Sequence, residues 1–239
     1  MITTLDDFIR EFRLIKEMGW IPTHRSGPTG IGKTLEDLLN IPENNSDEPD
    51  FGDYELKSVR SSATSMLTMF TKSPEPDRSN MILLQKYGYS SGAVYRNDNL
   101  VLHSTLSADR FTSIRGVHQL KVTCFDDRIA IESQNGVEPI FWKRETLQAC
   151  FNRKYRGEFV YAYANTKGRG TTEQFHFVDA YVVSGFNYDD FAKLLELGQI
   201  KIDLRIGQYP DGRIHDHGTG FRIRKKDEVL LFKNRNQIV

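Results

Sequence analysis

The stretch PDFGDYELK, residues 49–57, brings together two carboxylates and a lysine that could act on a phosphodiester. In a strand, side chains two residues apart share a face, so Glu55 and Lys57 would lie side by side, and an upstream turn can bring Asp50 beside Glu55. The two carboxylates and the backbone carbonyl of Leu56 are hard oxygen ligands of the kind that Mg²⁺ takes. The lysine ammonium could then orient a water nucleophile or stabilise charge on the phosphate.

The same three side chains also have a plainer interpretation. Glu55 and Lys57 could be solvated residues on an exposed strand, with Asp50 as a turn residue, since such a short pattern also arises by chance. A DNA-binding module without catalytic activity, in which the acidic site is structural, therefore remains an alternative.

The segment GPTGIGKT, residues 27–34, matches the pattern G-x-x-x-x-G-K-[ST] of a phosphate-binding P-loop. A P-loop needs a buried strand that leads into the loop and a helix that leaves it. The preceding residues WIPTHRS contain Pro, His and Arg, and the helix that follows ends near Asn40 and Pro42. A P-loop ATPase is thus an alternative that lacks its structural setting, and we expect no dependence on ATP.

A second group of polar residues lies in DLRIGQYPDGRIHDHGTGFRI, residues 203–223. Arginine can form a bidentate pair with guanine, a carboxylate can accept from cytosine N4, and a histidine can pair with a base edge. An antiparallel ribbon carrying such side chains fits the major groove. The candidate DNA-contacting residues here are Asp203, Arg205, His215, Asp216, His217, Arg222 and Arg224. Two alternatives remain: Asp203 and Arg205 could form a surface ion pair, and the two histidines could bind zinc.

The elements that would position these residues alternate between helices and strands. Thr4 and Asp7 predict a capping box for an amphipathic helix over residues 5–18, and Asn187 predicts the start of a helix over 188–197. Strands are predicted for YELKSVR, SMLTMF, EFVYAYA, EQFHFVDAYVV, IKIDLRI and FRIRKK, and a hairpin joins VHQLKVTCF to RIAIES. KRETLQACFNRKY is predicted to be helical. The pattern indicates an α/β fold with a mixed sheet.

The composition is that of a folded protein of 239 residues, with 38% hydrophobic and 27% charged residues. It has no apolar run long enough to cross a membrane and no secretory signal, so we expect a cytoplasmic protein without membrane association. The formal net charge is zero, but residues 1–60 hold 12 Asp/Glu against 7 Lys/Arg, and residues 201–226 hold 7 Lys/Arg against 3 Asp. This distribution suits a cation site and a polyanion site on one chain.

The blocks GPTGIGKTLEDLL, PDFGDYELKS, MLTMFTKSP, EQFHF and IKIDLRIGQY followed by HDHGTGFRI resemble the MvaI/BcnI-type family of type II restriction endonucleases. That family consists of PD-(D/E)XK nucleases related to the MutH mismatch-repair nickase. The resemblance implies a nuclease-like mixed β-sheet with flanking helices, divided into a catalytic lobe and a DNA-recognition lobe. Residues 1–85 would form the catalytic lobe, with strands contributed by 155–185, and residues 86–239 the recognition lobe.

The resemblance also implies roles for individual residues. Asp50, Glu55 and the Leu56 carbonyl would hold Mg²⁺, for which Mn²⁺ could substitute; Lys57 would be the catalytic lysine and Glu36 an accessory carboxylate, although Glu36 could equally be an exposed helix acid. The glycines of GPTGIGKT would serve a tight turn and close backbone packing. Thr71 and Lys72 would lie on the catalytic side, placed for minor-groove or phosphate contacts.

The activity implied is cleavage of both strands of double-stranded DNA at a short CCNGG-type site, with CCWGG favoured. The enzyme would act as a monomer that cuts the strands in turn, alongside a cognate DNA methyltransferase. A MutH-like strand-specific nickase is the alternative within the same class.

Overall fold

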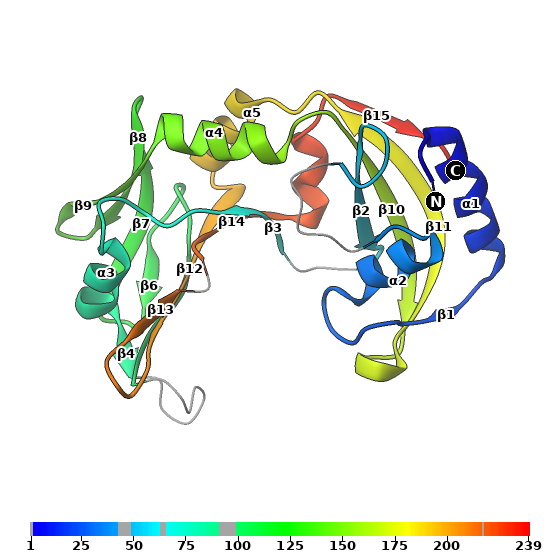
Figure 1. The fold of residues 1–239 in the computed structure, drawn as a ribbon. Coiled ribbons are helices and arrows are strands. Elements are labelled where there is room, and N and C mark those ends of the chain that lie inside the picture. The colour runs from blue at the N-terminus through cyan, green and yellow to red at the C-terminus, as the bar shows by residue number, and fades with distance from the viewer. Residues whose placement is uncertain (1, 43–48, 63–65, 91–98, 217) are drawn as a thin grey trace. The chain divides into compact units, whose positions relative to one another are not determined.

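The computed structural model describes residues 2–42, 49–62, 66–90, 99–216 and 218–239. Their contacts divide them into two compact units. Unit 1 combines the described parts of Met1–Thr64, Arg156–Phe186 and Phe232–Val239, and unit 2 combines those of Ser65–Tyr155 and Asn187–Leu231. Each unit carries helices beside β-sheet (Figure 1), which confirms the predicted α/β fold class.

Unit 1 is built on a mixed sheet with the strand order β1-β11-β10-β2. Strand β2 (Tyr54–Arg60) runs parallel to β10 (Glu158–Lys167), and β10 runs antiparallel to β11 (Gln174–Ser184). Strands β1 (Ile21–Pro22) and β15 (Asn234–Gln237) both pair antiparallel with β11. Because β10 lies between two neighbours, most of its first seven residues are buried, which matches its apolar, aromatic sequence.

Two helices of unit 1, α1 (Leu5–Glu17) and α2 (Gly30–Leu38), pack on this sheet. The capping box predicted at the start of α1 is present: Thr4 accepts from the Asp7 amide, and the Asp7 side chain accepts from the Thr4 amide. Phe8 and Phe12 of α1 are fully buried and share one core with Leu56 of β2. This packing leaves the opposite face of β2 for Glu55 and Lys57. A 3₁₀ turn, η1 (Gly170–Thr172), joins β10 to β11.

Unit 2 contains two sheets. In the larger one, the order is β3-β14-β12-β5-β4, with β13 also paired to β12; the smaller one has the order β6-β7-β8-β9. The strands are β3 (Met66–Thr71), β4 (Tyr89–Ser90), β5 (Leu100–Leu106), β6 (Thr112–Ile114), β7 (His118–Cys124), β8 (Arg128–Ser133), β9 (Gly136–Lys143), β12 (Ile200–Gln208), β13 (Ile214–Asp216) and β14 (Gly220–Arg224). The helices are α3 (Ser79–Tyr87), α4 (Arg144–Lys154), α5 (Tyr188–Glu196) and the 3₁₀ helix η2 (Lys225–Leu230).

Unit 1 contains residues 156–186, which the expected catalytic lobe (residues 1–85 with strands from 155–185) also includes, whereas the described residues from 66 to 85 belong to unit 2. Strand β3 pairs with β14, so residues 66–71 belong to unit 2 together with α3. Residues 156–186 belong to unit 1, where β10 and β11 complete the sheet. Among the described residues, no helix is both long and apolar enough to span a membrane.

Candidate active site and DNA-contacting surface

Strand β2 of unit 1 presents Glu55 and Lys57 on one face. Their side chains form an ion pair, in which Lys57 Nζ donates to Glu55 Oε1. The Lys57 ammonium also lies 5.8 Å from the centroid of the Phe159 ring on the neighbouring strand β10. Leu56, between them, points the other way into the core. The two-residue period of the strand therefore places the two charged side chains together, as the sequence predicts.

Asp50 is fixed beside the same strand by a turn. Its Oδ2 accepts a hydrogen bond of 2.7 Å from the Leu56 amide, six residues further along the chain. The turn is closed by reciprocal backbone hydrogen bonds between Phe51 and Tyr54, and Gly52 adopts a φ of +51° within it. A Cβ at Gly52 would lie 2.9 Å from the carbonyl oxygen of Thr3, so the turn needs a glycine there. The Asp50 carboxylate is thus held at the backbone of β2.

Helix α2 brings Glu36 to a pocket that Asp50 and Lys57 also line. This pocket of unit 1 has a volume of about 360 Å³, and Glu36, Asp50, Leu56 and Lys57 all line it. Glu55 is linked to the pocket through its ion pair with Lys57. The four side chains assigned to catalysis by resemblance therefore come from two elements and one turn of unit 1.

The donor chemistry of this pocket fits a hydrated magnesium ion better than a zinc ion. Among the described residues, no three His, Cys, Asp or Glu side chains are grouped closely enough to hold a metal by themselves, whereas zinc needs three or four such ligands. Magnesium keeps several of its waters and needs only one or two carboxylates. Because the N–H and C=O of one residue leave a strand toward the same edge, the Leu56 carbonyl faces the edge where Asp50 lies.

The GPTGIGKT segment does not have the setting of a P-loop. The strand before it, β1, has two residues and pairs antiparallel with β11. Lys33 donates to Asp37 one helical turn away, at 2.7 Å, and this hydrogen bond is the main reason that the pKa of Asp37 lies below its usual value. Within residues 20–42, all of which are described, the structure therefore contains no buried parallel strand that leads into the loop.

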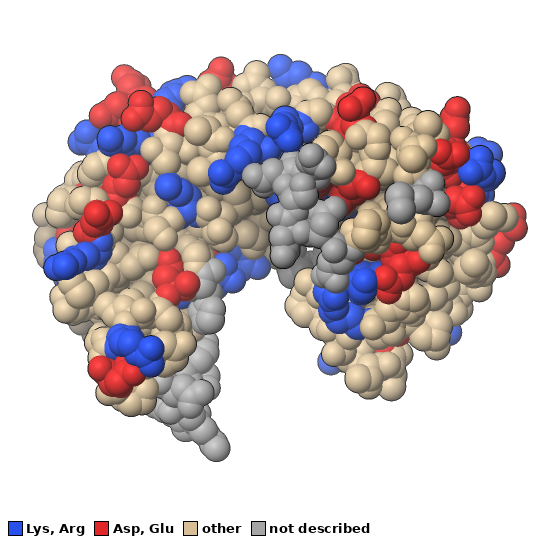
Figure 2. Space-filling view, in the orientation of Figure 1, with Lys and Arg blue, Asp and Glu red and all other residues tan. Residues whose placement is uncertain are grey.

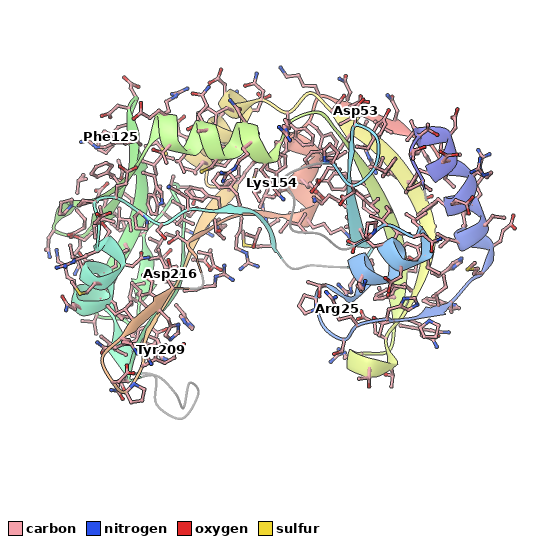
Figure 3. The ribbon with its side chains drawn as sticks, viewed as in Figure 1. Arg25, Asp53, Phe125, Lys154, Tyr209 and Asp216 are labelled. Carbon is pink, nitrogen blue, oxygen red and sulfur yellow. The ribbon has the colours of Figure 1, made fainter. Side chains whose placement is uncertain are left out.

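Two glycines of this segment have the packing role expected of them. Gly27 adopts a φ of +94°, and a Cβ at Gly30 would lie only 2.2 Å from the carbonyl oxygen of Arg25, the loop residue labelled in Figure 3. Gly32 differs, because the nearest atom to its added Cβ would be Glu36 Oε1 at 3.6 Å, an ordinary contact.

In unit 2, Asp203 and Arg205 lie on one face of β12. Asp203 is buried and accepts from Thr105 Oγ1 at 2.7 Å and from Arg222 Nη1 at 2.8 Å. Arg205 Nε lies 3.7 Å from the same Asp203 carboxylate, and Arg205 Nη2 donates to the Gly218 carbonyl at 3.1 Å. The ion pair considered for Asp203 and Arg205 is therefore present, but Asp203 makes a shorter contact with Arg222 of β14.

The two arginines of β14 are both bonded within the protein. Besides Asp203, Arg222 binds the Met66 carbonyl through Nη2 at 3.0 Å, so both terminal nitrogens of its guanidinium have a protein partner. Arg224, two residues further along β14, pairs with Asp227 at 2.7 Å. In Figure 2, basic and acidic side chains are likewise interspersed over the visible surface of unit 2. Base readout by Arg222 and Arg224 stays a prediction, and it requires these contacts to be shared with DNA or exchanged.

Asp216, which is labelled in Figure 3, ends strand β13, and His215 precedes it on the same strand. Asp216 Oδ2 accepts from Asn80 Nδ2 of α3 at 2.6 Å, and its Oδ1 accepts from the Gly218 amide at 2.8 Å. The His215 ring lies 4.4 Å from that of Tyr209. His217, also predicted to contact DNA, lies outside the described residues.

Thr71 and Lys72 belong to unit 2, whereas the strand β2 that carries Glu55 and Lys57 belongs to unit 1. Thr71 pairs with Gly220 in the β3–β14 ladder. The Lys72 amide donates to the Thr219 carbonyl at 3.0 Å, and the Lys72 carbonyl accepts from Trp142 Nε1 at 2.8 Å. The backbone of this block thus completes the sheet that carries Arg222, and the minor-groove or phosphate contacts expected of Thr71 and Lys72 stay a prediction.

Sequence reasoning missed the side chains that support these sites. Arg60 and Glu173, which bracket the loop before α2, are 113 residues apart, and Asn80 is 136 residues from Asp216. Neither pair has a local sequence pattern. For Thr105 the available signal was its position in an apolar strand, which does not reveal the register that puts it opposite Asp203.

Comparisons with known proteins identify the family of the whole chain. The sequence pattern of the MvaI/BcnI restriction endonuclease family matches residues 9–232. The chain is similar to the solved structure of the restriction endonuclease MvaI–cognate DNA substrate complex, with 30% identity, a TM-score of 0.79 and full coverage of both chains. It is also similar to restriction endonuclease MvaI in the absence of DNA, with 30% identity and a TM-score of 0.62, over 100% of this chain and 99% of that one. No curated protein sequence matches significantly.

Proposed function

Because the chain belongs to the MvaI/BcnI restriction endonuclease family, we propose that it is a Mg²⁺-dependent enzyme that cleaves both strands of DNA at a CCNGG-type site, with CCWGG favoured. The observation that carries this proposal is that Glu36, Asp50 and Lys57 line one pocket of unit 1 together. We further propose that it acts as a monomer that cuts one strand and then the other, in a system with a cognate DNA methyltransferase.

In the proposed site, Asp50, Glu55 and the Leu56 carbonyl would hold the metal, with Glu36 as an accessory carboxylate. The amide of Leu56 fixes one Asp50 oxygen, so the carboxylate is already oriented before a cation arrives. A bound Mg²⁺ would lower the pKa of a coordinated water and stabilise charge on the scissile phosphate. Lys57, which is paired with Glu55, would orient the attacking water or stabilise the phosphate through its ammonium.

The second part of the proposal concerns unit 2, whose polar face we propose reads the target. Asp203, Arg205 and Arg222 lie on adjacent strands of one sheet and offer both acceptors and bidentate donors. His215 pairs with Gly207 and so extends this face along β13, whereas Asp216 pairs with Ile206 of the other face and remains a predicted DNA contact. The predicted phosphate contact of Lys72 also belongs to this unit.

Plasmid cleavage tests the catalytic assignment. With Mg²⁺, a supercoiled plasmid carrying one CCWGG site should be nicked and then linearised, and EDTA should prevent both steps. Asp50→Ala and Lys57→Ala should each abolish cleavage while the affinity for target DNA stays within about tenfold, because these residues act on the reacting phosphate and not on base edges. Glu17→Ala, which removes an exposed acid of α1, is the matched control and should cleave normally.

The outcomes separate the alternatives. Accumulation of nicked plasmid without linear product would favour a strand-specific nickase, and cleavage of CCSGG in place of CCWGG would correct the target. Near-normal cleavage by Asp50→Ala or Lys57→Ala would refute the catalytic assignment.

A further inference from the structure

Arg60, the last residue of β2, forms a set of contacts that no catalytic role requires. Its Nε and Nη2 donate to the two oxygens of Glu173 at 2.8 and 3.0 Å, a bidentate pair in which Arg60 is 21% exposed and Glu173 12% exposed. Its Nη1 donates to the Pro28 carbonyl at 2.8 Å, and its Nη2 donates to the Gly27 carbonyl at 3.1 Å. Four hydrogen bonds thus come from one guanidinium, whose planar fork carries five donors.

These contacts hold the segment that leads into α2 from both sides. Arg60 binds the carbonyls of Gly27 and Pro28, immediately before the helix begins at Gly30. The backbone of Glu173 binds the start of the same segment, because its carbonyl accepts from the Thr23 amide at 2.9 Å. The Arg60–Glu173 pair therefore joins β2, β11 and both ends of the loop formed by residues 23–29.

Contacts other than a side-chain cap hold the N-terminus of helix α2: the Gly30 amide donates to the Gly27 carbonyl at 3.1 Å, and Thr34 Oγ1 donates to the Gly30 carbonyl at 2.8 Å. The N-cap residue Thr29 makes no side-chain capping hydrogen bond, and the first turn contains no acidic residue. A capping side chain ordinarily satisfies the free amides there and stabilises the start of the helix. An arginine near the positive end of a helix dipole is unfavourable by itself, and the carboxylate of Glu173 offsets this charge.

The held segment forms one side of the candidate active site. The loop contributes Arg25, Pro28 and Thr29 to the pocket. Helix α2 contributes Ile31, Gly32, Lys33 and Glu36, and β2 contributes Leu56, Lys57 and Ser58. Arg60 lies three positions after Lys57 on β2 and binds the loop that begins the helix of Glu36. It is thus a direct hydrogen-bonded link between the two elements that supply the site.

We propose that Arg60, oriented by Glu173, is a positioning residue that fixes α2, and with it Glu36, at the distance from Lys57 that cleavage requires. The effect on cleavage rests on the proposed function. The stabilisation of α2 by Arg60 does not depend on that function. A displacement of about 1 Å between catalytic groups lowers a rate by roughly 100-fold. Loss of the link should therefore reduce the chemical step much more than DNA binding.

The test compares Arg60→Lys with wild type in three measurements. Lysine keeps the charge, but one ammonium cannot reproduce the bidentate pair and both carbonyl contacts. We expect the single-turnover cleavage rate to fall by about 10- to 100-fold. The dissociation constant for target DNA, measured without Mg²⁺, should stay within about threefold. Hydrogen exchange should accelerate in residues 30–38 and remain unchanged in α1.

Two further variants complete the design. Arg10→Lys makes the same substitution in an exposed ion pair with Asp7 on α1 and should leave all three measurements unchanged. Glu173→Gln keeps Arg60 but replaces one acceptor with an amide donor, and it should shift cleavage and exchange in the same direction as Arg60→Lys. If Arg60→Lys does not fold, Glu173→Gln provides the test.

Several results would overturn the proposal. Unchanged exchange in residues 30–38 would show that Arg60 does not hold α2, whatever happens to the rate. An equal loss of affinity for target and unrelated DNA would make Arg60 a phosphate contact. If the wild-type protein cleaves no DNA, the proposed function fails, and the exchange measurement alone decides whether Arg60 fixes the helix.

Discussion

Replacing Arg222 with alanine should destabilise unit 2 strongly, because Arg222 is the main ionic partner of a buried carboxylate. Asp203 Oδ2 accepts from Arg222 Nη1 at 2.8 Å, and the Asp203 side chain is only 10% exposed. The same arginine binds the Met66 carbonyl at 3.0 Å and so connects β14 to β3 a second time, in addition to their ladder. Its removal leaves a buried charge with weaker compensation.

The contacts around Asp203 determine how far the free energy of unfolding should fall. Removing one partner of a fully buried ion pair costs about 3–5 kcal/mol. Here the arginine is 26% exposed, so water can reach part of the site. Arg205 Nε lies 3.7 Å from the same oxygen, and Thr105 continues to donate to the other oxygen at 2.7 Å. These two neighbours reduce the penalty, and we expect the free energy of unfolding to fall by about 2 kcal/mol.

Urea unfolding followed by the fluorescence of Trp142 measures this change in unit 2 alone. Trp142 is fully buried 5.8 Å from the ring of Phe221, and the other tryptophan, Trp20, can be changed to phenylalanine to remove the signal from unit 1. Arg224→Ala is the control, since its pair with Asp227 is 48% exposed on the arginine side and should contribute less than about 1 kcal/mol.

A double-mutant cycle with Asp203→Asn isolates the pair, and its coupling energy should be about 1–2 kcal/mol. If Arg222→Ala changed the free energy of unfolding no more than Arg224→Ala does, the stabilising role would be refuted. The guanidinium would then be available to a guanine base, and a loss of discrimination at one base pair would identify it as a reader.

Two other predictions concern helix α2. Gly30→Ala should destabilise unit 1 and lower cleavage, because its Cβ would lie 2.2 Å from the Arg25 carbonyl oxygen. Gly32→Ala should leave the free energy of unfolding in urea nearly unchanged, because its Cβ meets only an ordinary contact. Equal destabilisation by both substitutions would contradict this reasoning. The hydrogen bond from Lys33 is the largest of the causes that lower the pKa of Asp37 below 3.8. The stabilisation is therefore present above pH 3.8 and lost as the pH falls through the folded-state pKa. Asp37→Asn should lower the thermal midpoint at pH 7, and the difference from wild type should disappear in acid, below the folded-state pKa. An equal difference at pH 7 and in acid would contradict this reasoning.

Local sequence patterns predicted the elements well where a few neighbouring residues determine them. The capping box of Thr4 and Asp7 starts α1, and the Asn187 side chain accepts from the Asp189 amide at the start of α5. The hairpin between VHQLKVTCF and RIAIES forms as β7 and β8, since alternating apolar residues on both sides of a polar turn specify it. Each of these features depends on contacts between residues that are close in the chain.

In the candidate active site, too, the sequence predicted the contacts between residues close in the chain but not those between distant segments. The strand period alone placed Glu55 beside Lys57, and a six-residue turn brings Asp50 to the Leu56 amide. By contrast, nothing local indicates that MLTMFTKSP pairs with β14, because an apolar strand of this kind can complete any sheet with an open edge. The sequence therefore did not reveal the sheet to which this strand belongs.

The arginines illustrate why residue type within a motif does not by itself assign a role. Arg60 and Arg222 each bind a carboxylate that is distant in the sequence and at least one backbone carbonyl from a different segment, and in both pairs the carboxylate is the less exposed partner. Arg205 stands in the same motif as Arg222, yet it is 36% exposed, against 26% for Arg222, and it lies further from Asp203. A side chain that makes weaker contacts within the protein loses less when it turns to a base edge. Of the two arginines first assigned to guanine, Arg222 is therefore the one whose loss should lower the stability of unit 2, and base readout by either arginine stays a prediction.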